Sequence, residues 1–327
     1  MLTLNSGLST YTVIGSKERM ASSGLAAVLL NSGSGIYSKR NSIETLKKQG
    51  FDYIVSVENS GEHYEAQQLC ELFPFVCFVL LKEPTSIGQM INIAAGELKS
   101  PLFFVIWNDF HLLQGLTNTR IVEKMLTPND KDWYMRLCMV PVIQDSAFAT
   151  LPTAGRPVIL RKKMNIQPFS PNTECAPTIF AYKGIGIYSR ELFFNIGGFD
   201  PSIKAEYWQL MDFGVRAWLW GQRLQTTQLV RLRYDGDFSA TDTTVDEAYW
   251  AFFLKNLAPV LRRNSKQGDT YPCHIPWAYF MQYWLKSQQS LTQAYKKFRE
   301  ARLWVRQNST HYVYDASQME SFFRTVL

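Results

Sequence analysis

The sequence predicts an α/β protein with a doubly wound, mainly parallel sheet and a helical extension at its C-terminal end. Two observations support this prediction. Short apolar runs of strand length alternate with helical patterns of about ten residues in the first third of the chain, which is typical of βαβ units and parallel pairing. From Thr244 onward the pattern is helical.

The elements of the first third are short and closely spaced. The expected strands are Leu25–Leu30 and residues 52–58, 75–81 and 102–106, with a further strand at residues 11–14. The expected helices are residues 43–49, capped by Asn41 and Glu44, residues 62–72, and a helix that Ser86 and Gln89 cap. Polar residues then follow the carboxyl ends of the strands, where open parallel sheets bind their ligands.

The rest of the chain alternates less regularly. We expect a helix at residues 116–126 and strands at residues 132–143 and 228–234. Residues 146–177 are rich in proline and are expected to form a long irregular connection. The predicted organisation is an N-terminal segment (residues 1–24), an α/β domain (25–240) and a helical C-terminal extension (241–327).

Composition narrows the function classes. With 46% hydrophobic residues in 327, the chain has ample material for a large core. A net charge of +6 with mixed signs fits an anionic small molecule or a membrane surface and falls short of a nucleic-acid-binding protein. Five unclustered cysteines indicate reduced thiols. Together with the lack of a secretory pattern and of a membrane-spanning apolar run, they predict a cytoplasmic protein.

A helix beginning at Glu206 carries a narrow polar stripe on an otherwise apolar surface. At 100° per residue, Glu206, Gln209, Asp212 and Arg216 share a wedge about 120° wide. The spacing of Asp212 and Arg216 also suits an ion pair. The stripe is typical of a wall of a binding site, and a solvated face with a surface ion pair is the alternative.

The features around this helix resemble the acceptor half of the family 2 glycosyltransferases. That family carries R-E-L-F, GGFD and E-D-x-D-L-x-x-R in this order. Here RELF stands at residues 190–193 and GGFD at 197–200, followed by Asp212 and Arg216. The Glu-Asp pair of the family is replaced by Gln209 and Leu210. The resemblance covers roughly residues 25–235.

The first half of the chain is similar to the nucleotide-binding half of the same family, in the stretches IETLKKQGFDYIVSVENS and IGQMINIAAGELKSPLFFVIWND. By this resemblance, Glu58 contacts the nucleoside and Asn92 matches the helix asparagine of the family. Asn108 and Asp109 end a strand at the donor site, and Asp109 stands where the second acid of the D-x-D motif holds the metal. Trp107 replaces the first acid of that motif.

The resemblance implies a GT-A fold and transfer of a sugar, with inversion, from a nucleotide diphosphate sugar to a hydroxyl of a saccharide, lipid-linked or protein acceptor. A divalent metal, Mn²⁺ or Mg²⁺, would stabilise the diphosphate that leaves. Asp212 and Arg216 would then be essential site residues. Leu210 cannot accept a proton, and Glu206 has no charged partner in its helix, which makes Glu206 the expected proton acceptor.

Two other functions remain open at this point. Trp107 and the Gln209-Leu210 pair favour a non-catalytic relative that binds a nucleotide or glycan. The sequence LLNSGSGIYSKR after the first buried strand favours a sugar nucleotidyltransferase, although Ile36 and Tyr37 interrupt the pattern of that class.

The C-terminal extension mixes aromatic and basic residues. Such helices are suited to peripheral contact with a membrane that holds a lipid-linked acceptor. The alternative is a helical appendage that packs on the catalytic domain. The residues that carry this pattern are Trp277, Phe280, Trp284, Leu291, Tyr295 and Phe298 among Lys286, Lys296, Lys297, Arg299 and Arg302.

Overall fold

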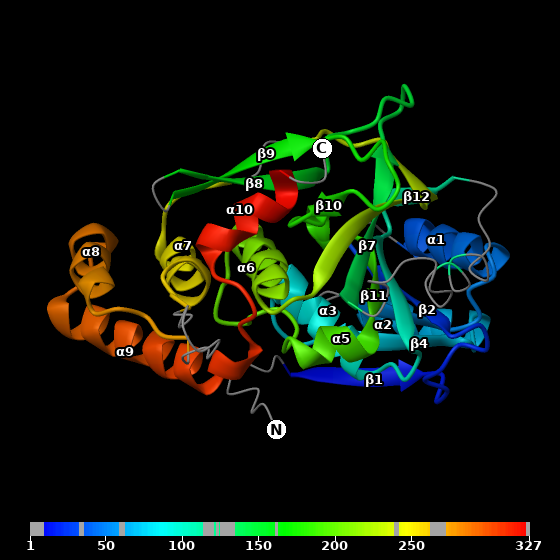
Figure 1. The fold of residues 1–327 in the computed structure, drawn as a ribbon. Helices are drawn as coiled ribbons and strands as arrows, with labels where there is room; N and C mark the ends of the chain where they lie inside the picture. The colour runs from blue at the N-terminus through cyan, green and yellow to red at the C-terminus, as the bar shows by residue number, and fades with distance from the viewer. Residues whose placement is uncertain are drawn as a thin grey trace.

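The computed structural model describes residues 10–32, 36–58, 63–113, 121, 124, 135–160, 163–238, 242–261 and 273–324. Within them, ten strands form one mixed sheet (Figure 1). These strands are β1 (Tyr11–Gly15), β2 (Leu25–Leu30), β3 (Ile54–Glu58), β4 (Val76–Leu81), β5 (Leu102–Trp107), β6 (Phe110–Leu112), β7 (Arg136–Gln144), β10 (Pro177–Thr178), β11 (Gly186–Ser189) and β12 (Arg223–Tyr234).

The sheet runs in the order β1-β4-β3-β2-β5-β11-β7-β12-β10, and β6 pairs with β12. Strands β4, β3, β2 and β5 are mutually parallel, β11 is antiparallel to both β5 and β7, and β12 is parallel to β7. All residues of β2, β3, β4 and β5 are buried. Strands covered on both faces need apolar side chains on both, which explains the unbroken apolar runs. The predicted mainly parallel sheet is therefore confirmed.

Some helices pack against this sheet, and others lie beyond its end. They are α1 (Ile36–Lys48), α2 (His63–Leu72), α3 (Ile87–Gly96), α5 (Arg190–Asn195), α6 (Glu206–Leu219), α7 (Glu247–Phe252), α8 (Ala278–Ser287), α9 (Leu291–Gln307) and α10 (Ala316–Arg324). Helix α3 contacts β2, β3 and α6, so it connects the parallel strands with helix α6. Helices α8 and α9 lie at one end, on the left in Figure 1, away from the parallel strands.

The predicted helical extension is present, and it packs on α6. The Trp208 ring of α6 stacks on Phe252 of α7, with ring centroids 5.3 Å apart. Trp220, which follows α6, stacks on His311 at 4.7 Å. The Tyr312 hydroxyl donates a hydrogen bond to the Lys255 carbonyl at 2.7 Å. Aromatic stacking and a buried polar contact therefore hold the extension on the α/β domain.

Helix α1 begins earlier than the sequence analysis predicted. We expected the helix to begin at residue 43, whereas α1 starts at Ile36. The extra turn carries Lys39, whose side chain is buried beside the end of β3. The ion pair of Lys39 with Glu58 therefore stabilises a helix start that the local capping pattern at Asn41 does not predict.

Residues 146–177 are not irregular as expected. They contain an antiparallel hairpin of β8 (Ala154–Leu160) and β9 (Lys163–Phe169), paired over seven residues on each strand. Pro157 and Pro168 interrupt the alternation of apolar and polar residues that would have predicted these strands, although Met164 and Ile166 follow it. Proline is tolerated here because the hairpin is a separate two-stranded sheet with open edges.

The remaining structural predictions concern one helix, the cysteines and membrane-spanning segments. Of the helix expected at residues 116–126, only Ile121 and Lys124 lie within the described residues, and both are helical. None of the five cysteines forms a disulfide. Within the described ranges, no helix is long and apolar enough to cross a bilayer.

Candidate functional site

The carboxyl ends of the parallel strands meet at one edge, as predicted. Asn31 at the end of β2 donates a hydrogen bond from Nδ2 to Oε1 of Glu58 at the end of β3, at 2.9 Å. On the other side of β2, the Ser32 backbone N–H and hydroxyl both donate to Oδ1 of Asn108, at 3.0 and 2.9 Å. Glu58 and Asn108 are thus brought to the same edge and hold the start of the loop after β2.

Glu58 is buried and paired at this edge. Its Oε2 lies 2.9 Å from Nζ of Lys39, and both side chains are almost fully buried. The Ser56 hydroxyl donates to Oε1 at 2.6 Å. Buried charges persist when they are paired and hydrogen-bonded, and this pair satisfies both conditions. Sequence reasoning missed Lys39, and the only signal for it was the basic Ser-Lys-Arg run at residues 38–40.

Asp109 follows β5 and is the predicted metal ligand. Its side chain is 32% exposed, and its Oδ2 lies 3.9 Å from Nζ of Lys183. Within the described part of the chain, its Oδ1 is buried and has no hydrogen-bond partner. The acid therefore has one oxygen facing a positive charge and one oxygen that still lacks a donor.

Lys183 occupies a strained turn immediately before β11. It lies in a 3-10 turn (Tyr182–Gly184) with φ 50° and ψ 23°, in the left-handed region. Its carbonyl accepts a hydrogen bond from Nε1 of Trp107 at 2.9 Å. Trp107, which by the sequence resemblance stands at the first D-x-D position, therefore holds the Lys183 backbone. No sequence motif pointed to Lys183.

Glu206 is the first residue of α6 and is exposed to solvent. The protein atoms around it remove part of its hydration and raise the pKa of its carboxyl group, and the positive charge of Lys183 partly offsets this rise. Burial raises the pKa of Tyr182 to about 12, with smaller contributions from Tyr234, Glu206 and Asp109. Glu206 and Asp109 therefore share one electrostatic environment around Lys183 and Tyr182.

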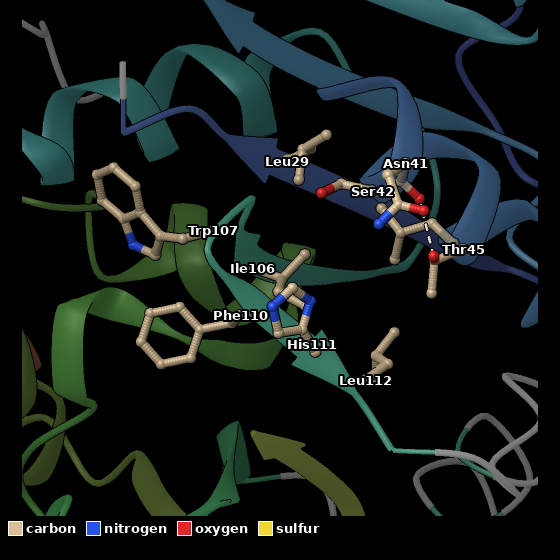
Figure 2. Close-up of a pocket in the computed structure, with 10 residues that line it drawn as sticks. Leu29, Asn41, Ser42, Thr45, Ile106, Trp107, Phe110, His111 and Leu112 are labelled. Carbon is tan, nitrogen blue, oxygen red and sulfur yellow. Dashed lines mark hydrogen bonds between the residues drawn. The ribbon is translucent and has the colours of Figure 1, made fainter. Parts of the chain in front are cut away.

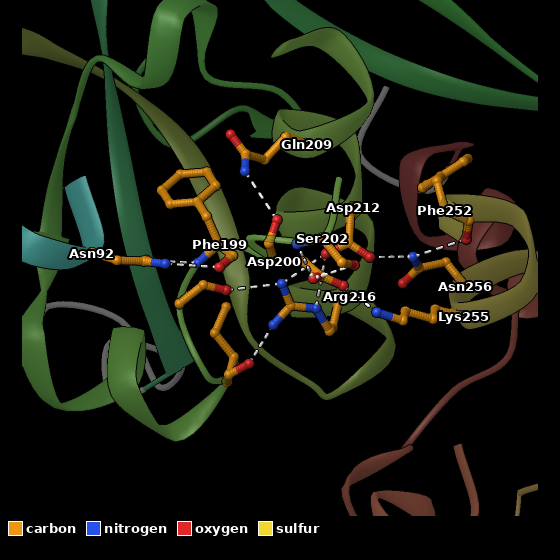
Figure 3. A network of polar contacts seen from close by, with 12 residues as sticks. Asn92, Phe199, Asp200, Ser202, Gln209, Asp212, Arg216, Phe252, Lys255 and Asn256 are labelled. Carbon is orange, nitrogen blue, oxygen red and sulfur yellow. Dashed lines mark hydrogen bonds and ion pairs between the residues drawn. The ribbon is translucent and has the colours of Figure 1, made fainter. Parts of the chain in front are cut away.

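Asn92 of α3 clamps the GGFD turn. Its Nδ2 donates to the Phe199 carbonyl at 2.8 Å, and its Oδ1 accepts from the Phe199 N–H at 2.9 Å (Figure 3). A Cβ on Gly198, which has φ 64°, would stand 2.5 Å from Oδ1 of Asn92. The turn needs glycine at this position because the amide approaches so closely.

Asp212 and Arg216 lie in the same network (Figure 3). Oδ2 of Asp212 accepts from Nε and from one terminal nitrogen of Arg216, at 3.2 and 2.8 Å, and Oδ1 accepts from Nδ2 of Asn256 at 2.7 Å. Arg216 also donates to the carbonyls of Ile196 and Gly198. The Asp212 side chain is fully enclosed. The predicted ion pair exists, and it links α6 to both the GGFD turn and the extension.

Asp200, the acid of GGFD, strengthens this link. It pairs with Lys255, which follows α7. Burial alone would raise the pKa of Asp200, but the Lys255 charge and hydrogen bonds from Lys255 and Ser202 outweigh it and lower that pKa. Lys255 therefore joins the extension to the GGFD turn, and Asn256 joins the extension to Asp212 of α6.

Gln209 and Leu210 replace the Glu-Asp pair of the resembled family. Oε1 of Gln209 accepts from the Gly88 N–H at 2.9 Å, and its Nε2 donates to the Ser86 hydroxyl at 3.1 Å and the Asp200 carbonyl at 2.9 Å. An orphan N–H in the first turn of α3 thus gains a partner. Leu210 is buried. Of the polar stripe, Glu206 remains on the surface.

A small pocket lies between helix α1 and the ends of strands β2 and β5 (Figure 2). Asn41, Ser42 and Thr45 of α1 line one side, and Ile106 and His111 line another. It has room for about one water molecule. A pocket of this size does not hold a nucleotide, whereas the surface around Asp109, Lys183 and Glu206 is open to solvent.

The resemblance implies a divalent metal at Asp109. A hard divalent cation takes several oxygen ligands. Among the described residues, no group of three or more His, Cys, Asp or Glu side chains is placed to hold a metal ion. A divalent ion about 4 Å from the Lys183 ammonium would also be repelled by roughly 8 kcal/mol at an effective dielectric of 20. The described residues around Asp109 therefore do not provide the ligands that a divalent metal requires.

Comparison with known proteins finds similarity in structure but not in sequence. No protein-family model and no curated protein sequence matches the chain. A crystal structure of GalNAc-T7 with UDP, GalNAc and Mn²⁺ superposes with a TM-score of 0.51 at 13% identity, over 73% of this chain and 51% of that chain.

Two further structures superpose less closely. S. aureus TarS gives a TM-score of 0.47 at 10% identity, over 90% of this chain and 44% of that one. The mannosyltransferase PcManGT from Pyrobaculum calidifontis, in complex with GDP-Man and Mn²⁺, gives 0.46 at 11% identity, over 92% and 76%. The chain spans about half the length of the first two proteins. The sheet topology and the likeness to GalNAc-T7 together show a GT-A-like fold.

Proposed function

We propose that this protein transfers a sugar from a nucleotide diphosphate sugar to a hydroxyl acceptor, with inversion at the transferred carbon. One observation carries the proposal. Asp109, at the carboxyl edge of the parallel strands, and Glu206, at the start of α6, both interact with the ammonium group of Lys183. A donor held at the strand edge would then place its reacting carbon near an acid that can accept a proton.

The nucleoside end of the donor belongs at the edge formed by β2, β3 and β5. Oδ1 of Asp109 is a buried acceptor that lacks a partner among the described residues, and a hydroxyl group of the donor would supply one. Glu58 and Asn108 hold the loop after β2 in place. Direct contact of Glu58 with a nucleoside requires the ligand to share this carboxylate with Lys39.

The acceptor end belongs at the start of α6. In a single displacement, the acceptor oxygen attacks the sugar carbon while the bond from that carbon to the diphosphate breaks. Glu206 takes the acceptor proton, and its raised pKa suits this role because a base works best with a pKa near the working pH. Asp212 and Arg216 act as positioning residues, since their contacts fix the GGFD turn beneath α6. Asn92 supports the same turn.

A second candidate is a non-catalytic protein that binds a nucleotide or a glycan. Two observations favour it. Trp107 stands at the position of the first D-x-D acid with its indole bonded to a backbone carbonyl, and Leu210 is buried at the position of the family base. Neither side chain can act as the acid that the resembled family has at that position.

The two candidates predict different products. The full chain is incubated with UDP- and GDP-linked hexoses and N-acetylhexosamines and with mixed saccharide acceptors, and the release of UDP or GDP is measured. We expect acceptor-dependent release from one donor class. Nucleotide binding without release would favour the second candidate, and neither binding nor release would overturn both.

The outer face of α8 and α9 is the surface that we propose for peripheral membrane contact. Trp277, Met281 and Leu285 are each more than half exposed and recur every four residues along α8. Leu291 is also half exposed, and the Tyr295 ring stacks on Trp277 with centroids 6.3 Å apart. The same two helices carry basic residues, namely Lys286, Lys296, Arg299 and Arg302. Such a face suits an anionic lipid surface that presents a lipid-linked acceptor.

Leu285→Ser should therefore weaken binding to vesicles of phosphatidylcholine and phosphatidylserine about tenfold, because a leucine side chain gains about 1.5–3 kcal/mol on leaving water. Vesicle co-sedimentation measures this. Leu72→Ser is the matched control, because Leu72 is an exposed leucine at the end of α2. Equal sedimentation of the wild type and both variants would exclude this face as a membrane contact.

A further inference from the structure

We propose that Lys183 supplies, from the chain itself, the positive charge that binds the donor diphosphate, in place of a divalent metal. The inference rests on the proposed function, because it assigns a binding residue for the donor of that reaction. The described residues around Asp109 do not form the metal site that the resemblance implies.

The backbone of Lys183 is held in an unusual conformation. A non-glycine residue at φ 50° is uncommon, and such residues persist where the surrounding structure holds them. Trp107 provides this restraint through its hydrogen bond to the Lys183 carbonyl. Trp107, which stands where the resembled family has the first D-x-D acid, therefore also holds Lys183 beside Asp109. The two residues are in contact although they lie 76 residues apart in the sequence.

The ammonium group of Lys183 lies among aromatic rings. Nζ is 5.0 Å from the ring centroid of Tyr234, 5.5 Å from Phe110, 5.9 Å from Tyr182 and 6.0 Å from Trp107. Phe110 and Tyr234 are themselves stacked, with centroids 4.4 Å apart. Ring faces attract a cation without using its N–H donors. The rings therefore fix the position of the charge and leave those donors for an anion.

The contact with Asp109 leaves the same donors available. At 3.9 Å the ammonium and the carboxylate attract each other without a direct hydrogen bond. Among the described residues, Nζ of Lys183 has no hydrogen-bond acceptor, and its side chain is 26% exposed. A lysine ammonium is a compact charge with three donors and is a common ligand of phosphate groups. The open side of Lys183 is thus suited to the oxygens of a diphosphate.

The chemistry of the proposed reaction is balanced with Lys183 in this role. The bond from the sugar carbon to the diphosphate oxygen breaks, and its electron pair stays on the diphosphate, where Lys183 stabilises the added negative charge. The bond from the acceptor oxygen to the sugar carbon forms, and the acceptor proton goes to Glu206. No further reactant is required.

The test is the binding of UDP and GDP to the full chain by titration calorimetry, in EDTA and in Mn²⁺. Lys183→Asn removes the charge and keeps a residue that tolerates a left-handed backbone, and Lys183→Arg keeps the charge. Lys99→Asn is the matched control, because Lys99 is exposed just before β5 begins, at the opposite end of that strand from Asp109. Uridine and guanosine report on binding that does not involve phosphate.

We expect wild-type affinity for UDP or GDP to be the same in EDTA and in Mn²⁺. Lys183→Asn should weaken nucleotide binding about 10- to 100-fold and leave nucleoside binding unchanged, because a hydrogen bond to a charged group is lost. Lys183→Arg should bind nearer to the wild type, and Lys99→Asn should bind like it.

Two results would overturn the inference in different ways. Metal-dependent nucleotide binding that Lys183→Asn does not alter would overturn the role of Lys183 and leave the proposed function standing. The absence of any nucleotide binding by the wild type would overturn the proposed function and this inference together. Thermal unfolding of each variant separates a loss of binding from a loss of folding.

Discussion

Replacing Glu206 by glutamine should lower sugar-transfer turnover by about 100- to 10,000-fold, which is the usual contribution of a positioned general base. The amide has nearly the same shape as the carboxylate but cannot accept the acceptor proton. Nucleotide binding should be unchanged, because Glu206 is expected to contact the acceptor and not the nucleotide. Release of UDP or GDP from the active donor measures turnover, and calorimetry measures nucleotide binding.

Glu191→Gln is the matched control for this variant. Glu191 is an exposed acid in the first turn of α5, as Glu206 is in the first turn of α6. Its substitution should leave turnover near that of the wild type. Turnover close to wild type in Glu206→Gln would show that another group takes the proton.

The pH dependence of turnover should follow the same residue. Loss of hydration raises the pKa of Glu206 above its ordinary value of 4.5, and Lys183 opposes the rise. The wild-type rate should therefore fall on the acid side at a pH above that value, because the carboxylate becomes protonated there. In Lys183→Asn, the opposing charge is absent, so this fall should move to a higher pH. An acid limb that is unchanged in Glu206→Gln would contradict the assignment.

Replacing Arg216 by methionine should lower the free energy of unfolding by about 3–5 kcal/mol, because it leaves the carboxylate of Asp212 buried without its charged partner. The change also removes hydrogen bonds to the carbonyls of Ile196 and Gly198. Urea denaturation followed by circular dichroism measures the loss.

Arg40→Met provides a close comparison. Arg40 and Glu44 form an ion pair with the same four-residue spacing, but their side chains are 55% and 37% exposed. Exposed helix pairs of this kind contribute about 0.3–0.5 kcal/mol. Equal losses in the two variants would show that burial of the Asp212–Arg216 pair has no energetic consequence.

A double variant, Arg216→Met with Asp212→Leu, separates charge from packing. Removing both members eliminates the unpaired charge, so part of the stability lost in the single variant should return. Asn256 then loses its contact with Asp212, which limits the recovery. A double variant less stable than Arg216→Met alone would contradict this account.

The parallel half of the sheet could be predicted from the sequence because its strands are buried on both faces. An unbroken run such as that of β2 or β5 admits few other structures when helices of about ten residues separate the runs. The edge residues Glu58, Asn108 and Asp109 followed from the ends of these strands. The hairpin of β8 and β9 was missed because prolines interrupt its local alternation.

The start of α1 could not be predicted from local signals. Asn41 and Glu44 form a good capping pattern, yet the helix begins at Ile36. Lys39 is carried on the added turn of this helix and pairs with Glu58, which ends strand β3. A contact between residues so far apart in the sequence leaves no periodic signal.

The sequence by itself determined the buried parallel strands, the acids at their ends, the GGFD turn and the helical character of the C-terminal extension. Only the tertiary structure decided the roles within the polar stripe of α6. Gln209 went to the start of α3, Asp212 and Arg216 were enclosed when the extension packed on α6, and Glu206 stayed at the surface beside Lys183. The physical reason is that helical spacing fixes which side chains share a face, whereas their burial and charge partners depend on the elements that cover that face.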